Sequence, residues 1–174
     1  MKIGSYKNII SIMVLLLFFN NNPPSISQDF MSNNMLEKGT IAPKFELLNS
    51  DNASIKLSDY KGKVVLLDFW YVGCKPCIKV YADIQNIQKE LGEENFVVLG
   101  MNPFNRKSQI NRYKKKYNYS DMALICTDKV KDAYKVRAYP SIYLIDKDGK
   151  IAFASAGYYA EFREKLKAEI KKIM

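Results

Sequence analysis

The feature that most limits the fold of this chain is a nearly continuous apolar run at residues 64–70. A strand with one face in water alternates apolar and polar residues, so an unbroken run indicates a central strand covered on both faces. Apolar residues then recur at helical spacing, at Val80, Ile84, Ile87 and Leu91. A second apolar run at residues 96–101 follows. Strand, helix and strand in this order predict a βαβ unit with a right-handed crossover.

The other segments predict one α/β domain over residues 39–174. Apolar and polar residues alternate at residues 43–47 and again at 55–57, which is typical of a hairpin. Beyond the βαβ unit we expect a helix at 108–117, a strand at 122–125, a helical turn at 129–135, paired strands at 141–145 and 151–156, and a final helix from residue 159. Together they predict a central mixed sheet flanked by helices, with an N-terminal β-hairpin extension.

The N-terminus has the pattern of an export signal. Lys2 and Lys7 precede an apolar run at residues 9–19, and Ser-Ile-Ser at 25–27 forms a cleavage site before Gln28. As a helix this run spans about 16 Å, roughly half of a bilayer core. We therefore favour a cleaved signal at residues 1–27 over an uncleaved anchor, with residues 28–38 as a flexible leader. The protein is then exported, to the periplasm or the outer face of the cytoplasmic membrane.

The chain contains no histidine, which excludes several classes of site. Nucleophiles activated by histidine are excluded, and so is the commonest ligand of zinc and haem. The formal net charge is +9 at pH 7, and a basic domain can bind nucleic acid or anionic lipid. Because the lysines are spread along the chain, we expect no nucleic-acid partner, and membrane contact only through an uncleaved N-terminal segment. We also expect no metal and no cofactor, while an acidic protein partner stays open.

Cys74, Lys75, Pro76 and Cys77 stand where the buried strand ends and the helix begins. Two cysteines three residues apart in a first helical turn place both sulfur atoms on one side, close enough for a disulfide. The positive end of the helix and the Lys75 cation both favour the Cys74 thiolate, so its pKa is expected below the usual value of about 8.5. Pro76 suits the first turn, where its nitrogen needs no partner. We expect Cys74 to face solvent and Cys77 to be partly covered.

Asp68 is the only charged residue in the apolar run and lies six residues before Cys74. An isolated buried carboxylate is costly, so its presence here indicates a function. A desolvated aspartate of raised pKa near Cys77 could take the proton of that thiol as a mixed disulfide resolves. The alternative is an aspartate at a strand edge, hydrogen-bonded to nearby backbone.

Pro140 comes directly before the next predicted core strand. Proline has no N–H to donate to the hydrogen-bond ladder of a sheet, so we expect Pro140 at a sheet edge or at a special bend of the backbone.

Taken together, these segments resemble the thioredoxin superfamily and, within it, the exported TlpA/ResA-like reductases. The resemblance covers the chain from about Gly39 to the C-terminus and rests on residues 39–45, residues 61–70, the Cys-x-x-Cys motif, Tyr139-Pro140-Ser141 and residues 144–149. It implies a thioredoxin-like fold in which Pro140 is a cis-proline facing the cysteines. It also implies that Tyr139, Lys75 and Pro76 help to hold substrate, and that Asp68 occupies the buried acid position.

The resemblance further implies a catalytic disulfide between Cys74 and Cys77. The protein would then reduce protein disulfides outside the cytoplasm with electrons from a membrane-bound donor. One departure concerns Gly73, which stands where these reductases usually have tryptophan and leaves the rim of the site smaller. The direction of electron flow stays open: the potentials of such pairs span from about −270 to about −120 mV. The resemblance favours a reductant, whereas stabilisation of the Cys74 thiolate by Lys75 favours an oxidant.

Three other interpretations were weighed. In a redox-inert binding module the Cys74–Cys77 pair would be a static disulfide. A peroxide-reducing relative would need proline and a hydroxyl residue before its reactive cysteine, where this chain has Leu67 and Tyr71. A zinc site would need more ligands than Cys126 alone supplies. We predict Cys126 to be a small core residue, with an accessory thiol near the site as the alternative.

Overall fold

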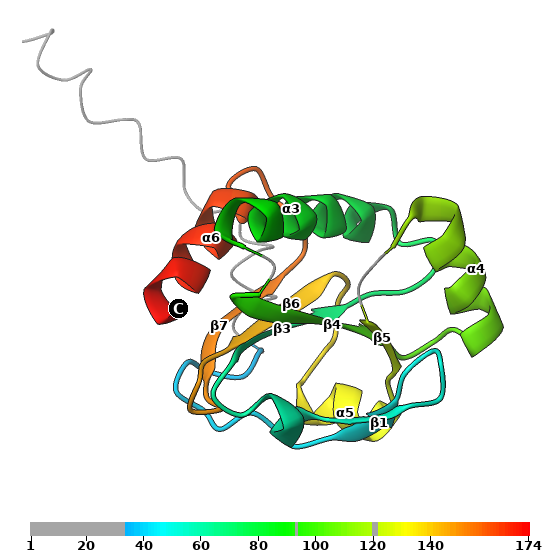
Figure 1. Cartoon of the computed structure of the whole chain (residues 1–174), viewed down its shortest axis with the longest axis horizontal. Coiled ribbons are helices and arrows are strands. Elements are labelled where there is room, and N and C mark those ends of the chain that lie inside the picture. Colours follow the sequence, from blue (N-terminus) through cyan, green and yellow to red (C-terminus); the bar gives the residue numbers. More distant parts are fainter. Residues whose placement is uncertain (1–33, 93, 120–121) are drawn as a thin grey trace, which may run out of the picture.

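The computed structural model describes residues 34–92, 94–119 and 122–174. The predicted signal at residues 1–27, and residues 28–33 of the predicted leader, lie outside the described residues. Within those ranges, no helix has the length and apolar character needed to cross a bilayer. The described chain folds around one sheet with helices on both of its faces (Figure 1).

A five-stranded mixed sheet lies at the centre, in the order β5-β4-β3-β6-β7. Its strands are β3 (Val64–Phe69), β4 (Phe96–Asn102), β5 (Met122–Ile125), β6 (Ser141–Ile145) and β7 (Ile151–Ala156). β3 and β4 are parallel, as are β4 and β5, whereas β6 is antiparallel to both β3 and β7. The predicted α/β fold with a mixed central sheet is therefore confirmed.

β3 is the middle strand, and all six of its residues are buried because each face of the sheet is covered. On one face Leu66 packs with residues of α3 (Lys75–Leu91) and α6 (Phe162–Ile173). On the other face Leu67 and Phe69 pack with buried residues that include Tyr134 and Tyr143. Successive strand residues point to opposite faces, so both layers are needed to bury this run.

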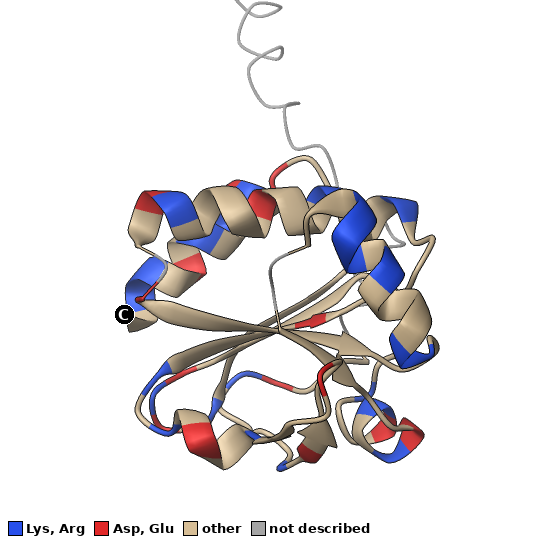
Figure 2. Ribbon diagram, turned by 45° about the vertical axis from the view of Figure 1, so that its right-hand side comes forward, with Lys and Arg blue, Asp and Glu red and all other residues tan. Residues whose placement is uncertain are grey.

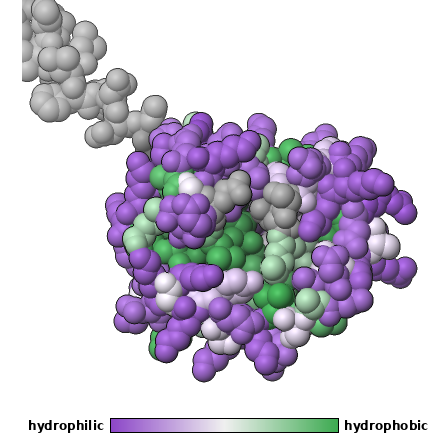
Figure 3. Space-filling view, viewed as in Figure 1, coloured by the Kyte–Doolittle hydropathy of each residue, from purple (hydrophilic) through white to green (hydrophobic). Residues whose placement is uncertain are grey.

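The layers are seen in Figure 1, where α3 and α6 lie on one side of the sheet. On the other side lie α5 (Asp128–Ala133), the short strands β1 (Glu46–Leu48) and β2 (Ser54–Lys56), and the 3-10 helix η1 (Leu57–Tyr60). α4 (Lys107–Tyr117) lies beside the β5 edge. Hydrophilic residues dominate the outer surface, and apolar residues show mainly in the middle of the view, between the two layers (Figure 3).

The predicted N-terminal hairpin is present but shorter than expected. β1 and β2 pair antiparallel over three residues each. The first strand begins after Pro43, which has no N–H to donate to a ladder and whose carbonyl accepts a hydrogen bond from the Tyr134 hydroxyl at 2.8 Å. An isolated bridge between Asn49 and Leu124 attaches the hairpin to β5.

Candidate active site

The cysteine pair lies at the first turn of α3, just after β3 ends. Cys74 is the N-cap of the helix, and the N–H of Cys77 donates a hydrogen bond to its sulfur at 3.2 Å. The two side chains form a disulfide, with their Cα atoms 5.3 Å apart. Lys75 and Pro76 occupy the first two helical positions, where proline costs no hydrogen bond. The predicted placement of the motif is confirmed.

Both cysteines are buried: Cys74 is 1% exposed and Cys77 is 3% exposed. The expectation that Cys74 faces solvent is therefore wrong for the disulfide form. The cause is that Cys74, bonded to Cys77, packs in the same apolar cluster as Trp70. Lys75 and Pro76, in contrast, are exposed between the two cysteines.

Gly73 precedes the pair with a φ of +97°. A side chain is strained in this conformation, although a Cβ atom there would meet no atom within 4 Å. Glycine is therefore favoured at this position by the backbone conformation of the loop and not by a shortage of space.

Asp68 is buried in the centre of the sheet, with 1% of its surface exposed. It pairs with Gly100 of β4 on one side and Ile142 of β6 on the other, so the alternative of a strand-edge aspartate is wrong. The alternation along β3 sends its side chain to the face that α3 covers. There the Tyr119 hydroxyl donates a hydrogen bond to Asp68 Oδ2 at 3.3 Å.

Tyr119 belongs to an aromatic stack between the sheet and the helices. Its ring stacks on Trp70 at 5.0 Å and on Tyr81 of α3 at 3.4 Å between centroids. Tyr113 of α4 packs on Trp70 at 5.4 Å. The stack shares one cluster with Cys74 and Cys77, so α3, α4 and the redox pair form a single packed unit. Tyr119 is not predicted as a site residue from the sequence, because it lies in a loop 51 residues from Asp68.

The peptide bond between Tyr139 and Pro140 is cis, as the family resemblance implied. Pro140 directly precedes β6, whose first residue, Ser141, pairs with Phe69, the last residue of β3 before the loop that carries the cysteines. Pro140 is buried and Tyr139 is partly buried.

Three aromatic rings meet beside the cis-proline, each from a different segment. Tyr139 contacts Tyr71 with ring centroids 5.5 Å apart and Phe104 at 5.2 Å, and Tyr71 and Phe104 are 5.9 Å apart. Tyr71 is 36% exposed and Phe104 is 57% exposed. We call these three residues the aromatic rim. Phe104 is not among the site residues predicted from the sequence, although its position just after a parallel strand is a usable signal.

The loop that carries Phe104 is fixed by asparagine side chains. Asn102 Oδ1 accepts hydrogen bonds from the N–H groups of Phe104 and Asn105 at 3.2 and 2.9 Å, the pattern of an Asx turn. Asn105 Oδ1 in turn accepts a hydrogen bond from the N–H of Val72 at 2.7 Å. The β4–α4 loop is thereby tied to the loop that precedes Cys74.

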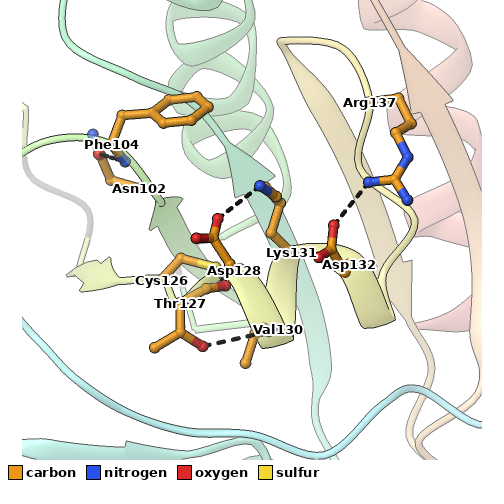
Figure 4. Close-up of polar contacts among 9 residues, drawn as sticks. All are labelled: Asn102, Phe104, Cys126, Thr127, Asp128, Val130, Lys131, Asp132 and Arg137. Atoms are coloured by element: carbon orange, nitrogen blue, oxygen red, sulfur yellow. Dashed lines mark hydrogen bonds and ion pairs between the residues drawn. The ribbon is translucent and has the colours of Figure 1, made fainter.

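The Tyr139 hydroxyl is buried and has no hydrogen-bond partner within the described part of the chain. Burial, together with smaller contributions from the nearby Cys126, Asp128 and Asp132, raises the pKa of Tyr139 to about 12. Figure 4 shows Cys126 just before α5, Asp128 at the start of this helix and Asp132 near its end; Asp128 pairs with Lys131, and Asp132 pairs with Arg137. Tyr139 therefore stays a neutral phenol at physiological pH.

Cys126 directly follows β5 and lies in the core cluster on the α5 face. It is 5% exposed, and burial raises its pKa to about 12. The prediction of a core cysteine is confirmed. No group of three or more His, Cys, Asp or Glu side chains within the described ranges could hold a metal ion.

Iodoacetamide should leave Cys126 unmodified in the native protein after dithiothreitol treatment. Only the thiolate reacts, and a pKa of about 12 leaves roughly one thiol in ten thousand ionised at about pH 8. The thiolate fraction then rises tenfold with each pH unit up to that pKa. Peptide mass spectrometry should find Cys126 modified only after unfolding in guanidinium chloride, and modification at the rate of an exposed thiol would contradict the assignment.

Comparison with known proteins places the chain among thioredoxin-like proteins. Residues 38–154 match the AhpC/TSA family. Thiol-disulfide oxidoreductase ResA of Bacillus subtilis (strain 168) is 31% identical over 133 residues, which are 76% of this chain and 74% of that protein.

Solved structures agree with this placement. A protein described as the thiol:disulfide interchange protein DsbE of Chlorobium tepidum superposes with a TM-score of 0.73 and 27% identity, over 79% of this chain and 98% of that chain. An exposed lipoprotein thioredoxin of Streptococcus pneumoniae strain TIGR4 superposes with a TM-score of 0.63 and 31% identity, over 75% and 99% of the two chains. The chain thus belongs to the AhpC/TSA family and is a thioredoxin-like thiol-disulfide oxidoreductase similar to ResA.

Proposed function

We propose that this oxidoreductase reduces protein disulfides outside the cytoplasm by cycling Cys74 and Cys77 between dithiol and disulfide. The observation that carries the proposal is the disulfide at the first turn of α3, where the Cys77 N–H donates to the Cys74 sulfur. The export pattern at residues 1–27 supports the location. The ResA relatives, named for thiol-disulfide exchange, support the reaction.

Cys74 is the attacking cysteine in this proposal. In the dithiol form the positive end of α3 and the Cys77 N–H stabilise its thiolate, and the exposed Lys75 adds a cation. The thiolate attacks one sulfur of a substrate disulfide, forms a mixed disulfide and releases the other substrate sulfur as a thiolate. Cys77 then attacks Cys74, and the second substrate sulfur leaves. Two electrons pass to the substrate, and each of its sulfur atoms gains a proton.

Asp68 is the proton acceptor for Cys77 in this proposal. Cys77 must lose its proton before it can attack the mixed disulfide. Asp68 lies on the face of β3 that α3 covers, and the Tyr119 hydroxyl holds its Oδ2 atom. A buried carboxylate held in this way can act as a general base for the resolving step.

The aromatic rim and the cis-proline are proposed to hold the substrate. The cis-proline directly precedes Ser141, which pairs with Phe69 at the end of β3, where the chain enters the cysteine loop. Tyr71 and Phe104 present exposed ring surface next to Tyr139. An extended substrate segment can lay its backbone along residues 139–140 and an apolar side chain against the rim. A membrane-bound dithiol donor is proposed to regenerate the Cys74–Cys77 pair.

The full chain should accelerate the reduction of insulin by dithiothreitol, seen as turbidity. Cys74→Ser should abolish the acceleration because the attacking thiolate is lost. Cys77→Ser should instead accumulate a mixed disulfide with insulin on a non-reducing gel. Cys126→Ser is the matched control and should keep full activity. Unchanged activity of Cys74→Ser would contradict the proposed cycle.

Asp68→Asn should slow the resolving step roughly a hundredfold, because the amide cannot accept the Cys77 proton. Attack by Cys74 on a peptide disulfide should change much less. Stopped-flow release of the first and second substrate thiols separates the two steps. Tyr119→Phe keeps the carboxylate and should cost less than Asp68→Asn. Equal slowing of both steps would indicate a purely structural role for Asp68.

Residues 1–38 should export a reporter. Fused to an alkaline phosphatase that lacks its own signal, they should give an active enzyme, since this phosphatase folds only where its disulfides form. Leu15→Arg should abolish the activity by breaking the apolar run. In the protein from cells, a mature N-terminus at Gln28 is expected. An inactive fusion would contradict the extracytoplasmic location.

A further inference from the structure

α4 is the most unevenly charged helix of the described chain. Its eleven residues include five cations and no acid, and the cations are Lys107, Arg112, Lys114, Lys115 and Lys116. Figure 2 shows basic residues along this helix and no acidic ones. None of the five forms an ion pair with a described residue. We call these five cations the basic face of α4.

The other long basic helix shows what a charge-balanced surface looks like in this protein. On α6, Arg163 and Lys167 both pair with Glu90 of α3, and Lys172 pairs with Glu169. Those cations are partly neutralised by neighbours. The basic face of α4 therefore does not reflect the general basicity of the chain alone.

Helix stability explains only part of the basic face. Lys114, Lys115 and Lys116 lie in the last turn, where cations interact favourably with the helix dipole. Lys107 is the first helical residue and Arg106 is its N-cap, and cations at that end oppose the dipole. Their presence therefore has a local cost that helix stability does not explain.

α4 is also directly attached to the redox site. Its inner residues Ile110 and Tyr113 pack in the same cluster as Cys74 and Cys77. Phe104 of the aromatic rim precedes its first residue by three positions. The other cations of the basic face follow Lys107 along a helix that spans about 16 Å, or about two screening lengths at physiological salt.

A groove of about 380 Å³ runs between α3 and α4. Ile78, the residue after Cys77, lines it together with Tyr81, Tyr113 and Tyr117. Ile78 is 40% exposed and Tyr117 is 45% exposed. Tyr113 and Tyr117 are adjacent in sequence to Arg112, Lys114 and Lys116, so a polypeptide in this groove would lie beside cations of the basic face.

We infer that the basic face of α4 docks acidic polypeptide segments that flank the disulfides this protein reduces. The inference rests on the proposed function and adds to it a class of substrate. Opposite charge across such a surface raises the rate of encounter and selects among partners more than it adds affinity. The exchange itself is unchanged: the Cys74 and Cys77 dithiol is oxidised to a disulfide, and the substrate disulfide is reduced to two thiols.

An anionic membrane fits this surface less well than an acidic polypeptide does. Helices that lie on membranes bury an apolar face in the lipid. The apolar face of α4, formed by Ile110 and Tyr113, is instead buried inside the protein. Its outward face carries Arg112 and Lys115, and Tyr117 at its last position is its one exposed large apolar residue.

The test compares three model peptides with the same disulfide and with acidic, neutral or basic flanking residues. Rate constants for their reduction by the full chain, in its dithiol form, are measured by stopped flow between about 20 and about 300 mM salt. At low salt the acidic peptide should react roughly tenfold faster than the neutral one. That advantage should vanish at high salt, because screening removes it.

The diagnostic variant is Arg112→Glu/Lys115→Glu, at two exposed positions that leave the packed face of α4 intact. It should remove the preference for the acidic peptide and leave the rate with the neutral peptide unchanged. Lys61→Glu/Lys171→Glu is the matched control with the same change in charge. Lys61 precedes β3, at the opposite end of the strand from Cys74, and Lys171 is in the last turn of α6. This control should keep the preference.

Each outcome separates the inference from the proposed function. Equal rates for acidic and neutral peptides, or loss of preference in both double variants, would overturn docking at α4 and leave the redox function standing. Absence of reduction of all three peptides would overturn both. Binding to phosphatidylglycerol vesicles that is lost only in the α4 variant, with no peptide preference, would assign the surface to membrane contact and overturn the inference.

Discussion

Burial of β3 between two layers is the constraint on which the rest of the structure depends. All six residues of this strand are inaccessible to water, so helices must cover one face and α5 with the N-terminal hairpin must cover the other. The strand ends at Phe69, and the chain then turns into α3, whose first turn holds the cysteine pair. The helix end that polarises the sulfur atoms is thus positioned by the same packing that stabilises the core.

The same strand also carries a carboxylate, Asp68, whose burial without a hydrogen-bond partner would be unfavourable. Asp68 lies in the middle of the sheet, where an unpaired charge would be strongly destabilising. The Tyr119 hydroxyl gives it a partner, and the ring of Tyr119 is held by stacking on Trp70 and Tyr81. The polar group that the proposed chemistry needs is therefore supported by aromatic packing.

Around this buried centre, the surface of the site has two parts of different character. The aromatic rim offers ring surface next to the cis-proline, while the basic face of α4 offers unpaired positive charge beside it. Apolar contact supplies most of the affinity in such interfaces, and charge mainly sets the rate of encounter and the choice of partner. Together, the two parts would suit a substrate segment that has an apolar residue close to its cysteine and acidic residues farther along the chain.

The sequence by itself determined the order of the elements, the central position of residues 64–69, and the cysteine pair at a helix start. These follow from patterns within short stretches of chain, which local periodicity and spacing encode. Only the tertiary structure decided that Tyr119 reaches Asp68, that Tyr71, Phe104 and Tyr139 meet, and that Cys74 is buried in its disulfide form. Those contacts join loops that are far apart in sequence, and no periodic pattern records which loops come together when the layers pack.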